Sequence, residues 1–523
     1  MRQDVCSAIR CVLFLFGALA IAPPLQAEVK VPNLFSDHMV LQRGQAVPIW
    51  GTAAANEKLT VKFRQQSKET TADANGKWRV ALDALEVGEA SDLTIEGAAN
   101  KIQIVDVLVG EVWVGSGQSN MDGSVSGYAK GDPVLATLAA TPNFKIRLLK
   151  GGANGKWQVA TSQSNKGFSA LLYSFGVRLQ QQLNVPVGLM QGAVGGTPSG
   201  YWLSDEMLAA DEPCQAKVKQ LLATYDEGAE KGKYETRLAE WEKAAAVAKE
   251  KKVKEPAKPQ PPEKPGQVRG GRMGFLYQAH IQPFVGYGIR GVLWDQGESG
   301  TAIAGVDQYL LMGALIRGWR KAWGQNDFPF LYVQKPSGGG CAWDPKAEET
   351  NKADPFVSLP PAPSSAGQGV YRELHIKIAT YPNTAMVISS DLGPGIHPTN
   401  KSGYGARAAR VARAVAYGEK VEYYGPVYKS HQVEGNQVKV QFTHVGEGLA
   451  SRHSEKLQGF QIAGEDKVFH WAEAKIEGET VILSSEKVPA PVAIRYAWAD
   501  RINWANLFNK DGLPAQTFRT DSW

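Results

Sequence analysis

The sequence predicts an α/β protein in which a mainly parallel sheet lies between two smaller domains that resemble β-sandwiches. Two observations support this fold class. In residues 106–417, apolar runs alternate with helical stretches, as they do in parallel sheets. In residues 28–105 and 418–523, short runs with period-two alternation are separated by turn residues, which is typical of antiparallel β domains. The 523 residues, 43% hydrophobic and 21% charged, suffice for several buried cores.

The first 27 residues predict an export signal. Arg2 and Arg10 precede an apolar run from Val12 to Ala22, which is followed by prolines and Ala27. The run has the length of the apolar region of a signal peptide and is too short to span a bilayer. We therefore expect cleavage near Ala27, a secreted or periplasmic protein, and no membrane association after cleavage. The alternative is an uncleaved anchor.

The strand signals of the two flanking domains are explicit. The dipeptide Asn75-Gly76 is a strong hairpin signal within residues 28–105. The alternating runs are Leu59–Phe63, Lys77–Leu82 and Leu93–Gly97 in the first domain, and Gln437–Phe442, Gly459–Gly464, Thr480–Ser485 and Val492–Trp498 in the last. We interpret both regions as β-sandwich-like domains.

The central domain, residues 106–417, contains five apolar runs that we expect to be strands. They are Val107–Val114, Val187–Val194, Ile289–Trp294, Phe330–Val333 and Ala385–Ser389. Helical patterns occupy Gly167–Asn184, Val306–Trp323 and Lys401–Tyr417. This alternation predicts strand–helix–strand units and therefore a parallel sheet.

An insert, residues 225–268, interrupts the central domain. Tyr225–Lys254 is rich in Ala, Glu and Lys and predicts a helix, whereas Glu255–Gly266 is rich in Pro and Lys and predicts an extended linker. Residues 228–269 hold 11 Lys or Arg and 7 Asp or Glu, so most of the net charge of +5 lies there. We interpret the insert as a solvated helical excursion, with polyanion binding as the alternative. The near-neutral remainder argues against a nucleic-acid partner.

Four segments with chemically active side chains follow expected strands. They are Gly115–Met121, Gly195–Trp202, Asp295–Gly300 and Ser390–Lys401. Ligands bind beyond the carboxyl ends of parallel strands, so the four segments should converge at one sheet edge. Their residue types suit acyl transfer. Ser119 follows a glycine turn that exposes its hydroxyl, and His397 can accept its proton. Backbone N–H groups of Gly195 and Gly196, and the side-chain amide of Gln296, can stabilise an oxyanion.

Other chemistries do not fit the sequence. The glycine turn at Gly115–Ser119 lacks the third glycine of a dinucleotide-binding fingerprint and is not a P-loop. The eight histidines form no HxH or HExxH pattern, so we do not expect a catalytic metal. Beyond the signal segment only Cys214 and Cys341 are present. An oxidising compartment would permit a bridge between them, although their spacing gives no support for one.

The motifs GQSNM, GGTP followed by Trp202, QGES and HPTNK, in this order, resemble the sialate O-acetylesterase family of SGNH-type hydrolases. The similarity extends to NLFSDHMVLQR at Asn33–Arg43 and to NLFNKDGLPAQTFRTD at Asn506–Asp521. It covers nearly all of the chain after the signal segment, except the insert and the loop Lys335–Tyr371.

The resemblance implies an SGNH-type, flavodoxin-like central domain and removal of O-acetyl groups from sialic acids or other glycans without a cofactor. It implies Ser119 as nucleophile and His397 as base. The oxyanion hole would combine the Ser119 N–H, a glycine of Gly195 and Gly196, and Gln296. Nothing in the sequence specifies an oligomeric state.

The chain departs from the family at Gly395, where members often carry an acid two residues before the histidine. That acid normally fixes the tautomer and stabilises the imidazolium. Three groups are alternatives for orienting His397: Asp391, Glu298, or a backbone carbonyl in the turn 393–396. Glu298 has a second interpretation, which is to hold Gln296 in place.

Candidate substrate contacts are Gln118, inside GQSNM, and Arg372 and Trp343, which border or lie in the loop Lys335–Tyr371. An arginine suits a sugar carboxylate because its planar fork binds two oxygens. The alternative is a surface loop in which Arg372 is a structural ion-pair partner. Two rival functions stay open: an acetylesterase for xylan or pectin, and a non-catalytic glycan-binding protein.

Overall fold

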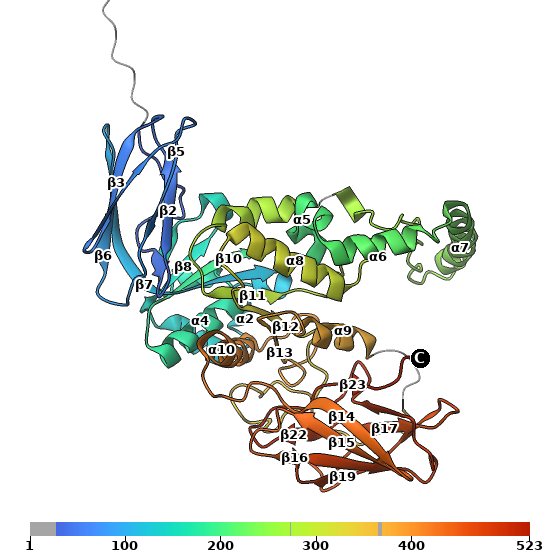
Figure 1. The fold of residues 1–523 in the computed structure, drawn as a ribbon. Coiled ribbons are helices and arrows are strands. Elements are labelled where there is room, and N and C mark those ends of the chain that lie inside the picture. The colour runs from blue at the N-terminus through green and yellow to red at the C-terminus, as the bar shows by residue number, and fades with distance from the viewer. Residues whose placement is uncertain (1–27, 272, 364–368) are drawn as a thin grey trace, which may run out of the picture.

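The computed structural model describes residues 28–271, 273–363 and 369–523, so the expected signal segment 1–27 lies outside the described residues. A central sheet with helices on both faces is joined to β sheets at the N-terminal and C-terminal ends of the chain (Figure 1). None of the helices in these ranges is both long and apolar enough to cross a membrane.

The central sheet has the strand order β13-β12-β11-β7-β10-β8-β9. Neighbours along this path are parallel, except that β9 pairs antiparallel with β8. The strands are β7 (Lys101–Gly117), β8 (Asn143–Lys150), β9 (Trp157–Ala160), β10 (Val187–Ala193), β11 (Gly291–Asp295), β12 (Phe330–Val333) and β13 (Thr384–Val387). The sequence pattern does not predict β8 and β9, because β8 begins with exposed residues, including Phe144 at 70% exposure.

Helices cover both faces of this sheet (Figure 1). Val112 and Val114 of β7 pack into a core with helix α8, whereas the intervening Trp113 packs on the other face with α4 and α10. The helices are α1 (Ser119–Asp122), α2 (Val125–Tyr128), α3 (Pro133–Ala140), α4 (Ala170–Leu183), α5 (Asp205–Ala209), α6 (Glu212–Leu222), α7 (Glu227–Glu250), α8 (Gln308–Trp323), α9 (Val370–Ile378) and α10 (Lys401–Tyr417). The long helices begin at side-chain caps, since Ser169, Asp307 and Asn400 each accept a backbone N–H of the first turn.

The N-terminal strands form two layers over one core. They are β1 (Val40–Gln42), β2 (Val47–Thr52), β3 (Lys58–Phe63), β4 (Gln66–Thr71), β5 (Lys77–Leu82) and β6 (Ser91–Glu96). The boundary that the sequence predicts at residues 105 and 106 falls within β7, whose first half pairs antiparallel with β6. One strand therefore belongs to both regions, and the full eleven-stranded sheet is mixed.

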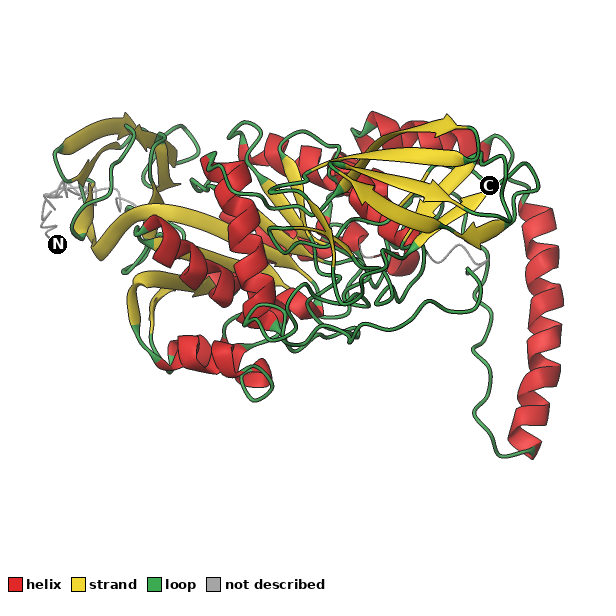
Figure 2. Ribbon diagram, turned by 90° about the horizontal axis from the view of Figure 1, so that it is seen from below, coloured by secondary structure: helices red, strands yellow, loops and turns green. Residues whose placement is uncertain are grey.

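At the C-terminal end, two four-stranded sheets share one hydrophobic core. The strands are β14 (Val427–Glu434), β15 (Gln437–Thr443), β16 (Leu449–Ser451), β17 (Phe460–Ala463), β18 (Phe469–Trp471), β19 (Glu473–Glu477), β20 (Thr480–Ser484), β21 (Ala493–Tyr496), β22 (Leu507–Asn509) and β23 (Phe518–Arg519). Both Cys214 and Cys341 are buried and free, so the two cysteines are not bridged to each other. In the insert, helix α7 projects away from the sheets (Figures 1 and 2).

Candidate active site

Ser119 lies where β7 ends and the short helix α1 begins. The strand tip requires a glycine at position 117, because its φ is +127° and a Cβ there would lie 2.1 Å from the carbonyl oxygen of Asp295. The N–H of Gln118 donates to the same carbonyl at 2.9 Å. Ser119 is half-buried, and within the described residues its own N–H finds no backbone acceptor. The serine therefore has an accessible hydroxyl on a fixed backbone.

His397 reaches Ser119 from the loop that follows β13. Its Nε2 lies 2.8 Å from Ser119 Oγ, although 278 positions separate the two residues in the chain. The imidazole is exposed, as are Gly395 and Ile396 immediately before it. The structure thus brings together, at the carboxyl edge of the sheet, the two side chains that the sequence predicts as nucleophile and base, at a distance suitable for proton transfer.

Neither expected carboxylate contacts His397, which corrects both assignments. Asp391 is fully buried and accepts two hydrogen bonds from Arg407, at 3.2 and 3.0 Å. Glu298 is engaged by Lys335, Gln118 and Asn120. Across the described parts of the chain, no carboxylate or turn carbonyl accepts a hydrogen bond from His397 Nδ1. A cation stabilises a buried carboxylate better than a neutral imidazole does, which explains why Asp391 lies against Arg407 and Glu298 against Lys335.

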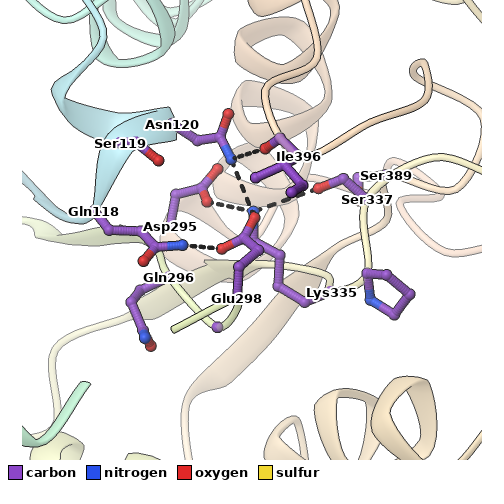
Figure 3. A network of polar contacts seen from close by, with 12 residues as sticks. Gln118, Ser119, Asn120, Asp295, Gln296, Glu298, Lys335, Ser337, Ser389 and Ile396 are labelled. Carbon is purple, nitrogen blue, oxygen red and sulfur yellow. Dashed lines mark hydrogen bonds and ion pairs between the residues drawn. The ribbon is translucent and has the colours of Figure 1, made fainter. Parts of the chain in front are cut away.

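Gly195 lies directly beside the serine, since a Cβ on it would be 3.6 Å from Ser119 Cβ. Gly196 has a φ of +72° and faces open space. Within the described residues, neither glycine N–H donates to another backbone group. Gln296 differs from the prediction: its amide donates to the carbonyls of Thr197, at 3.4 Å, and Gly300, at 3.1 Å. Figure 3 shows this amide pointing away from Ser119, so it holds two loops together rather than facing an oxyanion.

The three expected substrate contacts are used elsewhere. Gln118 is 2% exposed, donates to Glu298 and accepts the hydroxyl of Ser299 at 2.8 Å. Arg372 is 1% exposed and donates to backbone carbonyls, including that of Asp500 at 3.0 Å. Among the described residues no carboxylate forms an ion pair with Arg372, and its burial leaves little of the guanidinium open to a sugar. The ring of Trp343 packs against Phe508 and under Arg452 of the C-terminal β region, at 5.8 and 4.8 Å. Each side chain is held by protein groups.

A buried network of charges lies close to Ser119 (Figure 3). Lys335 Nζ contacts Asp295 Oδ1 at 2.6 Å and Glu298 Oε1 at 2.7 Å. Burial alone would lower the pKa of Lys335, but the two carboxylates outweigh it and raise the pKa above its usual range. Burial raises the pKa of Asp295, against the opposing effect of Lys335. The network fixes the chain directly after β11 and β12.

Asn120 connects this network to the histidine loop. Its Nδ2 donates to Glu298 Oε1 at 3.1 Å and to the carbonyl of Ile396 at 2.9 Å, while its Oδ1 accepts from Lys401 Nζ at 2.7 Å. Lys401 is fully buried and lies over the ring of Tyr128, at 4.5 Å. Burial lowers the pKa of Lys401 to about 7.

Sequence reasoning assigned no role to Asn120, Lys335 and Lys401. Asn120 and Lys401 stand inside the motifs GQSNM and HPTNK, and Lys335 follows β12 after one residue. The available signal was their position, because every polar side chain just beyond a parallel strand is a candidate for the site at that edge. Within the described residues, no cluster of three or more His, Cys, Asp or Glu side chains is placed to hold a metal ion.

Comparisons with known proteins show which proteins the chain is similar to. The chain is 28% identical to the sialate O-acetylesterase of Rattus norvegicus over 519 residues, covering 89% of each protein. It is 26% identical to that of Homo sapiens, covering 89% of this chain and 87% of the relative. A crystal structure of a carbohydrate acetylesterase from Xanthomonas citri superposes with a TM-score of 0.73 at 30% identity, covering 95% of this chain and all of that one. No protein-family model matches the chain.

The chain is similar over most of its length to enzymes that cleave acetyl esters, and a hydroxyl and an imidazole are in contact at the edge of its parallel sheet. These observations together define a carboxylic ester hydrolase. Both the curated relatives and the solved structure align along most of this chain, β regions included. The chain belongs to the sialate O-acetylesterase family.

Proposed function

We propose that this protein is a serine carbohydrate O-acetylesterase that removes acetyl groups from sialic acid or a related acetylated glycan. The observation that carries the proposal is the 2.8 Å contact between Ser119 Oγ and His397 Nε2. The names of the relatives supply the substrate class. On the same grounds we propose that the central sheet is an SGNH-type domain and that the β regions at both ends are separate flanking domains.

In the proposed mechanism, Ser119 Oγ attacks the acetyl carbonyl carbon while His397 Nε2 takes the serine proton. We propose that the oxyanion accepts hydrogen bonds from the backbone N–H groups of Ser119 and Gly195, because the two residues are in close contact. The C–O bond to the sugar breaks, and the sugar oxygen leaves with the proton from His397. Water then loses a proton to His397 and attacks the acetyl-serine, and acetate leaves as Ser119 regains its proton.

A cavity of about 470 Å³ is a suitable place for the sugar. It is lined by residues 299–305 together with Glu263 and Arg269, at the end of the insert. Ser299 in its wall donates its hydroxyl to Gln118, the residue before Ser119. We propose that the backbone and side-chain polar groups of this cavity bind the hydroxyl groups of the sugar.

The deciding experiment measures acetate release by wild-type protein and by Ser119→Ala, with Ser67→Ala in exposed β4 as the matched control. The substrates are an aryl acetate, O-acetylated sialic acid, acetylated xylan and acetylated pectin. We expect Ser119→Ala to lose at least ~1000-fold in kcat with an unchanged melting temperature. Aryl acetate hydrolysis by Ser119→Ala at the wild-type rate would refute the serine mechanism.

A second substrate class, acetylated plant or microbial polysaccharide, fits one comparison equally well. The solved structure from Xanthomonas citri is named for carbohydrate, without reference to sialate. The same panel separates the two classes, because kcat/KM is compared between O-acetylated sialic acid and the acetylated polysaccharides. Glycan binding without any acetate release would instead support a non-catalytic protein.

Export is also a proposal, resting on the apolar run Val12–Ala22 and the small residue at position 27. N-terminal sequencing of protein recovered from the periplasm or the medium tests it. A mature N-terminus near Glu28 is the expected result, and an intact N-terminus on all of the protein would contradict it.

A further inference from the structure

The loop that carries His397 has little packing of its own. Gly395 has a φ of +90° with no atom within 4 Å of where a Cβ would be, and Ile396 is 65% exposed. No carboxylate contacts the imidazole within the described residues. A base on such a loop needs another group to hold it within reach of Ser119, because small errors of position are costly in catalysis.

Asn120 makes the contact that can hold the loop. Its Nδ2 donates to the carbonyl of Ile396, the peptide directly before His397, at 2.9 Å. Within the described residues, the segment 394–397 has no other side-chain hydrogen bond apart from the contact of His397 with Ser119. Asn120 itself directly follows Ser119 in helix α1, so one peptide unit links the nucleophile to the group that holds the base.

The amide of Asn120 is locked in one orientation from both sides (Figure 3). Lys401 donates to its Oδ1 at 2.7 Å, and Glu298 accepts from its Nδ2 at 3.1 Å. Glu298 is in turn fixed by Lys335, whose side chain is fully buried. Rotating the amide would place its oxygen against two acceptors, the carboxylate of Glu298 and the carbonyl of Ile396, so only the observed orientation satisfies both of them.

We propose that Asn120, oriented by Lys401 and Glu298, is the positioning residue that holds His397 against Ser119 in place of an orienting carboxylate. The proposal rests on the proposed serine mechanism, since it concerns the same pair. It treats Asn120 as acting through the histidine rather than on the substrate. Its removal should therefore lower turnover and leave substrate binding nearly unchanged.

The test is Asn120→Asp, which preserves size and the acceptor for Lys401 but replaces the Nδ2 donor with an oxygen. We expect kcat for an aryl acetate to fall ~100-fold, as expected for a misplaced catalytic group, while KM changes less than ~3-fold. The matched control is Asn503→Asp, because Asn503 is also buried and donates to a backbone carbonyl, that of Pro355 at 2.7 Å, in the C-terminal region. The control should retain kcat.

A second readout separates positioning from loss of folded protein. An aryl phosphonate should label Ser119 of Asn120→Asp to the same final stoichiometry as in wild type, but ~100-fold more slowly, because labelling also needs the base. Lower stoichiometry with an unchanged rate constant would overturn the proposal in favour of a purely structural role.

Lys401→Met provides an independent variant that leaves Asn120 in place. Without the Nζ of Lys401 the amide oxygen loses its donor, so the amide is held less firmly, and we expect kcat and the labelling rate to fall ~10-fold. Wild-type kcat in both folded variants overturns the proposal; if Asn120→Asp does not fold, Lys401→Met decides alone. A wild-type protein whose aryl acetate hydrolysis does not depend on Ser119 would instead show that the proposed function has failed.

Discussion

The two members of the Ser119–His397 pair are held in place by different means. Ser119 stands at the tip of a buried strand, where Gly117 packs against the backbone of Asp295 with no room for a Cβ. His397 stands on an exposed loop that, among the described residues, receives one side-chain hydrogen bond, at Ile396, besides the contact of His397 with Ser119. The nucleophile is therefore positioned by main-chain packing and the base by a side chain. Changes near the first should appear in stability, and changes near the second in turnover.

The largest expected effect comes from Gly117→Ala. An alanine held at a positive φ costs ~1–2 kcal/mol, and forcing its Cβ into the packed backbone costs a further ~1–3 kcal/mol. We therefore expect the free energy of unfolding to fall by ~3 kcal/mol or more. Urea denaturation measures this. Gly395→Ala is the matched control, because position 395 also has a positive φ but open space around it. An equal loss in the free energy of unfolding in the two variants would show that position 117 is not packed more tightly than position 395.

Asp391→Asn tests whether the acid nearest His397 in the sequence serves catalysis or structure. Asp391 forms a buried pair with Arg407, and removing one partner of such a pair costs ~3–5 kcal/mol. Asparagine keeps an acceptor for Arg407, so we expect a loss of ~2 kcal/mol in the free energy of unfolding. The kcat of the folded protein should stay within ~3-fold of wild type. A loss of kcat with unchanged stability would restore Asp391 as a partner of His397.

A third comparison concerns a dependence of stability on pH that arises from Lys401. Burial lowers its pKa from 10.5 to about 7, although Asp295 opposes the shift. Between these pH values the unfolded chain binds a proton that the folded chain does not, so folding becomes more favourable as the pH rises. The gain is at most ~1.4 kcal/mol per pH unit. Lys401→Met should lack it, and denaturation of both proteins at pH 7, 8 and 9 tests this. Parallel curves for the two proteins would exclude Lys401 as the source.

Much of the sheet was predictable because its strands are continuous apolar runs bounded by turn residues. The runs at 187–194 and 330–333 coincide with β10 and β12, and the helix predicted over Lys401–Tyr417 is observed with the same bounds. Strand β8 was not predictable, since its alternation is broken by exposed residues at its start. The sequence pattern changes at residue 105, but β7 continues through this position because its first half pairs with β6 and its second half pairs with β10 and β11.

The sequence by itself determined the order of the elements and the four segments that follow their strands, because these depend on local periodicity and on residues next to one another. Only the tertiary structure decided which polar groups meet. Asp391 pairs with Arg407, Gln296 bridges two loops, and Asn120 reaches Ile396, none of which spacing along the chain reveals. The physical reason is that a buried charge or amide takes the partner that packing brings nearest, and that partner comes from a distant element.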